Sequence, residues 1–213
     1  MEMNTKQVYL LGCGPGAAEY VTPIVSDLVR QCTLLVGCPR TLALFPESKA
    51  ERLVYQNNLE ELLRLVAQRL AQTDRIAWLC TGDTGLRSIA ATVQKQLGLH
   101  QCIVVPGISS VQVACARMGI DWSSLRVISA HGVIPSFDLD HTEKRHYAVL
   151  AGSPEALPAM QRIAHALKHS HRLCVCQELT LPNETIKEIA PEDLSDWISH
   201  PRTLFIWMAN DHK

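Results

Sequence analysis

The sequence lacks long apolar runs and lacks an excess of charge of either sign. No stretch approaches the roughly 20 consecutive apolar residues that cross a membrane. The apolar run that follows Met1–Lys6 is too short for a secretory signal. Lysine and arginine together number 20 against 21 aspartates and glutamates, a net charge of −1. Surfaces that bind nucleic acid normally carry a strong basic excess. We therefore expect a cytoplasmic protein with neither a membrane nor a nucleic-acid partner.

The sequence also lacks the spacings that mark metal sites and disulfide frameworks. Its eight cysteines include no C-x-x-C pair, and Cys174 and Cys176 alternate within a run that predicts a strand, whose side chains point to opposite faces. Among the nine histidines, His165 and His169 have helical spacing, but no third ligand accompanies them. We expect free thiols, most of them buried, and no bound metal.

The composition is that of an ordinary globular protein, with alternating strand and helix signals. Apolar residues make up 47% and charged residues 19%, and 213 residues suffice for a sizeable core. Short apolar runs predict strands at 8–11, 33–36, 52–55, 75–80 and 102–105, with helices between them. Asn58 and Glu61 predict a capping box where one of these helices begins. Such alternation is typical of a parallel sheet covered by helices on both faces.

From Gly119 to Lys144 the sequence becomes more polar, which indicates a connector to a second unit. Beyond it, strands are predicted at 147–151, 172–177 and 203–208, with helices at 154–168 and from Pro191. Because few residues remain there for helices, we expect a mixed sheet in this half. The predicted fold class is α/β with two units, an N-terminal domain over 1–115 and a C-terminal domain over 116–213.

Glycine-containing loops follow three of the N-terminal strands. They are Gly12-Cys13-Gly14-Pro15-Gly16, Thr81-Gly82-Asp83-Thr84-Gly85 and Pro106-Gly107-Ile108-Ser109-Ser110. In a parallel sheet all three would leave the same carboxyl edge, where open α/β sheets bind their ligands. Glycine lets the backbone take positive φ and lets another group approach it closely. The sequence therefore predicts a small-molecule site at this edge.

One reading of the first loop is a dinucleotide site. Gly12, Gly14 and Ala17 fit the pattern G-x-G-x-x-G/A, which would make the protein an NAD(P)-dependent oxidoreductase. Against this, Pro15 has no N–H to offer a pyrophosphate. The second strand also ends in Gly37–Arg40 without the acidic residue that binds the ribose. A tight turn alone would need one glycine, so three favour a different small-molecule site.

At these separations, in a two-unit α/β chain, the three loops resemble those of the tetrapyrrole methylases. The resemblance runs over nearly the whole chain and implies the fold of that family, with a cofactor cleft between the two units. It further implies a methyltransferase that uses S-adenosyl-L-methionine. Its substrate would be a carboxylate-rich tetrapyrrole, and it would act as a homodimer.

Further segments resemble one branch of the family, which methylates C5 of precorrin-7 or cobalt-precorrin-7 in cobalamin biosynthesis. They are Val36–Arg40, Ser129–Gly132 and Glu178–Ile186. Two positions depart from the pattern, since Thr84 stands where proline is usual and Val133 where the branch usually has arginine. Four alternatives stay open: methylation of a different ring carbon, a member of the same fold that acts on RNA or a modified histidine, a binding protein without catalysis, and the oxidoreductase.

The resemblance also implies roles for individual residues. Cofactor contacts are implied for Thr81, Gly82, Asp83, Leu86, Ser109, Ser110, Ala151 and Leu179. Substrate contacts are implied for Gly12, Gly14, Pro15 and Gly16, and carboxylate binding is expected of Arg40, Arg87 and Arg117. The catalytic group is unassigned, with Asp83 and His131 as candidates. Asp83 could instead only cap its own loop, and Ser109 and Ser110 could only cap a helix.

Overall fold

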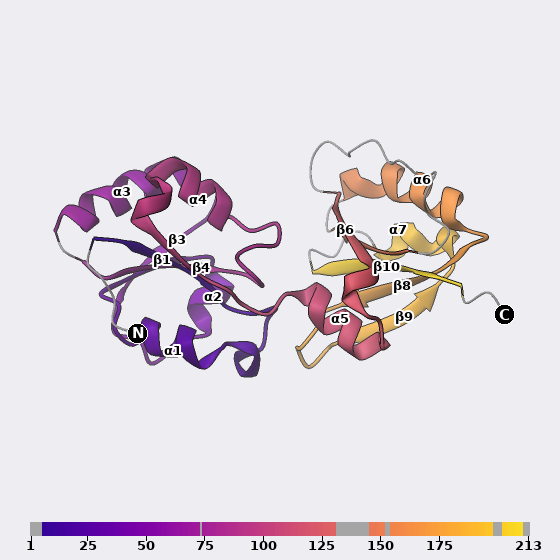
Figure 1. The fold of residues 1–213 in the computed structure, drawn as a ribbon, viewed down its shortest axis with the longest axis horizontal. Helices are drawn as coiled ribbons and strands as arrows, with labels where there is room; N and C mark the ends of the chain where they lie inside the picture. Colours follow the sequence, from indigo (N-terminus) through magenta and orange to yellow (C-terminus); the bar gives the residue numbers. More distant parts are fainter. Residues whose placement is uncertain (1–5, 73, 131–144, 152–153, 198–201, 211–213) are drawn as a thin grey trace. The chain divides into compact units, whose positions relative to one another are not determined.

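The computed structural model describes residues 6–72, 74–130, 145–151, 154–197 and 202–210. The chain divides into two compact units, Met1–Ser109 and Ser110–Lys213 (Figure 1). Each unit holds a five-stranded sheet with its own buried core. No helix within the described ranges is long and apolar enough to cross a membrane.

The first unit is built on a parallel sheet. Its strands are β1 (Val8–Gly12), β2 (Leu34–Gly37), β3 (Glu51–Val54), β4 (Ile76–Cys80) and β5 (Cys102–Val105). They lie in the order β3-β2-β4-β1-β5, and every neighbouring pair is parallel. All residues of β1, β2 and β4 are buried, which is why these strands stand out in the sequence as continuous apolar runs. The predicted parallel sheet is confirmed.

Helices cover both faces of this sheet, as predicted (Figure 1). They are α1 (Pro23–Val29), α2 (Pro39–Ala43), α3 (Leu59–Ala71) and α4 (Ala90–Leu97), with short 3₁₀ turns at Ala18–Tyr20 and Leu99–Gln101. On one face, Leu28 of α1 shares a core with Tyr9 and Leu11 of β1. On the other, Val66 of α3 shares a core with Leu10 of the same strand. The alternating side chains of β1 thus reach both layers.

Helix α3 begins after Asn58, as predicted, but the capping box is wrong. The Asn58 side chain makes no cap hydrogen bond; its Oδ1 accepts the Gln56 N–H at 2.9 Å instead. A short polar side chain can bond within the preceding turn as readily as to the helix, and here the turn is preferred.

The second unit has a mixed sheet, as predicted. Its strands are β6 (Leu125–Ser129), β7 (His146–Ala151), β8 (His171–Gln177), β9 (Thr185–Ile189) and β10 (Thr203–Ala209). The order is β6-β7-β10-β8-β9, with β6 and β7 parallel and the remaining pairs antiparallel. The helices are α5 (Ser110–Met118), α6 (Leu157–Leu167) and α7 (Leu194–Trp197), with 3₁₀ turns at Trp122–Ser124, Pro154–Ala156 and Pro191–Asp193. Met160 and Ile163 of α6 pack with Val149, Phe205 and Trp207 of the sheet.

Two strands of this sheet were not predicted. Residues 125–129 form β6 inside the expected connector, and residues 185–189 form β9. Both lie at the edges of the sheet, and each buries one residue, Ile128 and Ile189 respectively. Edge strands carry polar residues and lack the continuous apolar pattern of a central strand. Residues 131–144 of the expected connector lie outside the described residues.

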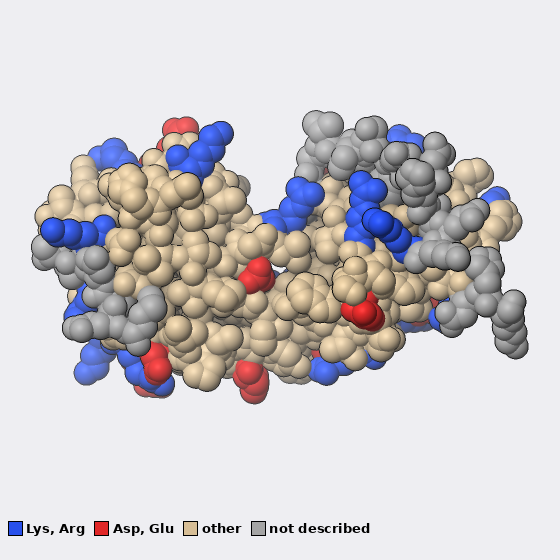
Figure 2. Space-filling view, viewed as in Figure 1, with Lys and Arg blue, Asp and Glu red and all other residues tan. Residues whose placement is uncertain are grey.

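Acidic and basic side chains are interspersed on the face of the first unit drawn in Figure 2, with uncharged residues between them. This distribution accords with the near-zero net charge of −1.

Candidate functional site

The three glycine-containing loops leave three adjacent strands of the first sheet. β1 lies between β4 and β5, so the loops that follow these strands emerge side by side at the carboxyl edge. A Cβ added to Gly12 would lie 2.5 Å from the Gly107 nitrogen and 2.9 Å from the Gly82 oxygen. The loops therefore pack backbone against backbone, at a distance that only glycine permits. The predicted convergence of the three loops is confirmed.

Hydrogen bonds tie the first two loops together. The Gly14 N–H donates to the Gly82 oxygen at 3.3 Å, and the Gly82 N–H donates back to the Gly14 oxygen at 2.8 Å. Both residues have positive φ, 77° and 69°, which glycine adopts without strain. The Cys13 N–H is also used, since it donates to the Cys80 oxygen at 2.8 Å. These main-chain N–H groups are engaged within the protein and do not point to a ligand.

Asp83 holds its loop to the loop after β5. Its Oδ1 accepts the Gly85 N–H at 2.8 Å, which closes an Asx turn, and its Oδ2 accepts the Gly107 N–H at 3.0 Å. Thr84 adds a second tie to the same strand, since its buried hydroxyl donates to the Val105 oxygen at 3.3 Å. Thr84, which departs from the family pattern, thus has a structural function that the sequence did not indicate.

The segment that follows β2 contributes a further group to the same edge. Arg40, at the start of α2, donates from Nη2 to the Thr81 hydroxyl at 3.2 Å, and so brings one predicted substrate residue to one predicted cofactor residue. Beside it, burial raises the pKa of the Cys38 thiol, but hydrogen bonds with Thr41 and Thr81 and the charge of Arg40 lower it, and the net shift is downward. Cys38 is therefore the thiol at this edge that ionises most easily, because burial raises the pKa of Cys13 and Cys80.

Predicted cofactor residues of the second unit also share one edge. Ala151 ends β7, and both Ala151 and Gln177 of β8 are paired with Thr203 of β10. Since β10 is antiparallel to both neighbours, β7 and β8 end at the same side of the sheet. Buried Leu179 lies two residues beyond the end of β8 on that side. Ser110 begins α5, and buried Ser109 precedes it.

Backbone strain is concentrated beside two predicted cofactor residues. Within the described ranges, four residues other than glycine have φ in the left-handed region: Asn57, Arg87, Glu178 and Thr180. Asparagine tolerates this conformation, whereas arginine, glutamate and threonine rarely adopt it. Arg87 follows Leu86, while Glu178 and Thr180 flank Leu179. Strained residues of this kind cluster at ligand sites, and nothing in the sequence marked these three.

The remaining predicted residues are placed as follows. Pro15 is buried, Gly16 is half-buried and Arg87 is exposed. Arg117 lies on α5 and donates from Nε to Glu184 Oε1 at 2.9 Å, so its guanidinium is already paired with a carboxylate. His131 and Val133 lie outside the described residues. No group of three or more histidine, cysteine or acidic side chains suited to a metal occurs in the part of the chain that the structure describes.

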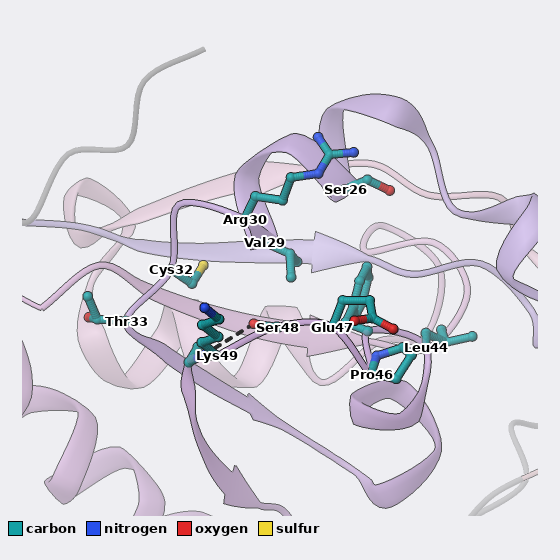
Figure 3. Close-up of a pocket in the computed structure, with 12 residues that line it drawn as sticks. Ser26, Val29, Arg30, Cys32, Thr33, Leu44, Pro46, Glu47, Ser48 and Lys49 are labelled. Atoms are coloured by element: carbon teal, nitrogen blue, oxygen red, sulfur yellow. Dashed lines mark hydrogen bonds between the residues drawn. The ribbon is translucent and has the colours of Figure 1, made fainter.

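A separate hollow of about 710 Å³ lies at the opposite edge of the first sheet (Figure 3). Its walls come from Ser26 and Val29 of α1, from Arg30 just after that helix, and from the segments that precede β2 and β3, 32–33 and 44–50. These segments lead into the amino ends of their strands, whereas the glycine loops leave the carboxyl ends. No residue predicted for the site lines this hollow.

Comparison with known proteins finds similarity to tetrapyrrole methylases. The sequence model of the family described as Tetrapyrrole (Corrin/Porphyrin) Methylases matches residues 7–195. A probable cobalt-precorrin-7 C(5)-methyltransferase from Methanocaldococcus jannaschii is 31% identical over 198 residues, which cover 88% of this chain and 93% of that protein. The cobalt-precorrin-7 C(5)-methyltransferase from Salmonella typhimurium is 30% identical over 178 residues, 83% of this chain and 87% of that one.

A solved structure shares the fold. The uroporphyrin-III C-methyltransferase from Thermus thermophilus, solved in complex with S-adenosyl homocysteine, superposes with a TM-score of 0.72. The alignment covers 95% of this chain and 97% of that one, at 21% sequence identity. The two-unit architecture is therefore common to both proteins.

Proposed function

This chain belongs to the tetrapyrrole methylase family, and we propose that it is an S-adenosylmethionine-dependent methyltransferase that methylates C5 of precorrin-7 or cobalt-precorrin-7 in cobalamin biosynthesis. The observation that carries the proposal is the likeness to the M. jannaschii and S. typhimurium proteins, which extends over more than four-fifths of each chain. The segments Val36–Arg40 and Glu178–Ile186, which resemble the same branch, support it.

Residues of both units are suited to hold S-adenosylmethionine. In the first unit, we assign the main chain of Thr81–Asp83 and the side chain of Leu86 to the cofactor, together with Ser109. In the second unit, we assign Ser110, Ala151 and Leu179. Closely packed glycine loops and strained residues beside Leu86 and Leu179 support this assignment, because such backbone is held in place before a ligand arrives. When bound, the cofactor supplies an electrophilic methyl group on a positively charged sulfur.

The chain's own contribution to catalysis is then mainly to position the reactants and exclude water. A carbon of a reduced tetrapyrrole is already electron-rich and needs little covalent assistance, so orientation for in-line displacement accounts for most of the rate. We assign the loop from Gly12 to Gly16 to the substrate, with Gly14 and Pro15 in its wall. Arg40 and Arg87 would bind substrate carboxylates. Arg117 is the weaker candidate for that task because it is paired with Glu184.

Asp83 has a positioning role in this scheme. Both of its carboxylate oxygens accept main-chain N–H groups, from Gly85 and Gly107, so the side chain is committed to holding the loops. Proton removal after methyl transfer would then fall to another group, and His131 remains the other candidate.

The contacts of the first loop argue against the oxidoreductase alternative. Dinucleotide sites present free main-chain N–H groups at the start of a helix. Here the Cys13 N–H is bonded to Cys80 of β4 and the Gly14 N–H to Gly82 of the neighbouring loop, and α1 begins later, at Pro23. Calorimetric titration separates the two activities: the purified protein should bind S-adenosylhomocysteine and give no heat with NAD, and the reverse pattern would refute the methyltransferase.

The ring position is tested by product analysis. Incubation with cobalt-precorrin-7 and S-adenosylmethionine labelled with ¹³C in the methyl group should give a product whose label lies on C5 in the NMR spectrum. Label on another carbon would favour a different branch of the family. Homodimer formation and a cytoplasmic location, which the resemblance implies, are tested by light scattering of the purified protein and by cell fractionation.

A further inference from the structure

The turn between β8 and β9 is the most strained segment of the described second unit. Glu178 and Thr180 have φ of 51° and 73°, and Leu179 between them is 5% exposed. Threonine is β-branched and disfavours this conformation strongly, so neighbouring contacts must hold it there. Such strain persists only where the surrounding structure over-determines it, and it is typical of sites that present main chain to a ligand.

Glu184 supplies the contact that holds Thr180. Its Oε2 accepts the Thr180 N–H at 2.6 Å, and its Oε1 accepts from Arg117 Nε of α5 at 2.9 Å. The N–H of Thr180 and the charge of Arg117 hold the pKa of Glu184 below its usual value, so the group is ionised and accepts with both oxygens at neutral pH. One carboxylate thus joins the strained residue to a helix.

A second ion pair anchors the other strained residue. Arg202, just before β10, pairs with the carboxylate of Glu178. The turn is also bonded internally, since Leu181 N–H donates to the Glu178 oxygen and Glu184 N–H donates to the Leu181 oxygen, both at 2.9 Å. At its root, Gln177 donates to the Thr203 hydroxyl at 2.9 Å. The whole turn is therefore rigid and lies at the sheet edge where Ala151 ends β7.

We propose that Glu184 is a positioning residue for the cofactor: it fixes Thr180 in the left-handed conformation, and so holds the main chain at Leu179 in the geometry that binds S-adenosylmethionine. Arg117 is its partner and acts through it. This inference rests on the proposed function, because it takes S-adenosylmethionine as the ligand. It adds two residues to the site, neither of which contacts the cofactor.

Substitution of Glu184 by glutamine tests the proposal. Glu184→Gln keeps the size but leaves one oxygen to accept and places an NH₂ group where the second acceptor was. We expect the Kd for S-adenosylhomocysteine and the KM for S-adenosylmethionine to rise at least about tenfold, the effect of losing one charge-assisted hydrogen bond. The KM for the tetrapyrrole should not change. Glu188→Gln is the matched control, because Glu188 is an exposed carboxylate on β9 that pairs with Arg172.

Rescue by glycine distinguishes positioning from general stability. Glycine takes positive φ freely, so residue 180 can keep the left-handed conformation in Thr180→Gly without the contact from Glu184. In the Thr180→Gly background, Glu184→Gln should weaken S-adenosylhomocysteine binding much less than it does alone. A role in stability only would lower the melting temperature of Glu184→Gln without this split between the two KM values and without the rescue.

The outcomes separate this inference from the function on which it rests. If the unaltered protein does not bind S-adenosylhomocysteine, the proposed function fails. If it binds and Glu184→Gln binds equally well, the inference fails. Should Glu184→Gln not fold, Arg117→Gln provides the second test, because Arg117 is 45% exposed and its loss leaves the bond from Thr180 to Glu184 in place. Unchanged affinity of Arg117→Gln for S-adenosylhomocysteine would then show that Arg117 does not act on the site through Glu184, and would overturn the proposal.

Discussion

Asp83 and Gly107 are joined across the carboxyl edge of the first sheet, with the Gly107 N–H donating to Asp83 Oδ2 at 3.0 Å. The two residues are 24 positions apart and belong to loops that follow β4 and β5, the strands on either side of β1. The same carboxylate closes the turn at Gly85. One side chain therefore sets the spacing of two loops that contain predicted cofactor residues.

Removal of this carboxylate should disable the site. Asp83→Ala leaves the N–H groups of Gly85 and Gly107 without their acceptor, at a cost of about 1–3 kcal/mol for each group that water does not reach. We expect methyl transfer to be lost while the fold persists, as measured by activity and by urea unfolding. Asp27→Ala is the control, because Asp27 is an exposed residue of α1. Unchanged turnover in Asp83→Ala would remove Asp83 from the site.

A methyl group at Gly107 should force the loops apart. The Cβ of Gly107→Ala would lie 2.4 Å from the Gly82 oxygen and 2.6 Å from the Gly12 oxygen. Both are backbone atoms, which cannot rotate away as a side chain can. We expect a loss of at least about 2 kcal/mol in unfolding free energy, together with weaker S-adenosylhomocysteine binding. At Gly119→Ala the φ of 67° is unfavourable for alanine, but no atom lies within 4 Å of the new Cβ. This control should lose only about 1 kcal/mol, and an equal loss in both variants would refute the packing explanation.

Cys38 should be alkylated before Cys32. Both thiols are half-buried, yet the pKa of Cys38 is lowered, whereas burial raises the pKa of Cys32 to about 12. The thiolate is the reactive form, so iodoacetamide at neutral pH should modify Cys38 first, as followed by peptide mass spectrometry. Arg40→Ala should slow the reaction at Cys38 and leave Cys32 unaffected. Faster labelling of Cys32 would contradict the assigned environment.

The contribution of Glu184 to stability should depend on pH. Its pKa is lower in the folded than in the unfolded protein, so its stabilising effect is complete above the unfolded value of about 4.3 and is lost as the pH falls through the folded value. Urea unfolding of the unaltered protein and Glu184→Gln should differ by about 1 kcal/mol near pH 7, and this difference should shrink as the pH falls below about 4.3. A difference that stays constant over this range would show that Glu184 does not titrate as the structure implies.

The central strands could be predicted from the sequence, whereas the edge strands could not. Residues of β1 and β4 are buried on both faces of the sheet. Such strands need continuous apolar runs, which are visible in the sequence. β6 and β9 bury one residue each, and their pairing partners are supplied by distant segments. The failed capping box at Asn58 has the same origin, because a local pattern allows two hydrogen-bonding partners and the fold selects one.

The sequence by itself determined the layers of the first unit and the edge at which its ligand site lies. Hydrophobic periodicity and glycine position are local properties, and they were sufficient to predict that the loops of Gly12, Gly82 and Gly107 lie at the same edge of the sheet. Only the tertiary structure decided which N–H groups are engaged, that both oxygens of Asp83 hold loops, and that Arg117 faces Glu184. The left-handed conformation of Thr180 is likewise set by the tertiary structure. Threonine does not favour it locally, so it exists because contacts from residues elsewhere in the chain outweigh the local preference.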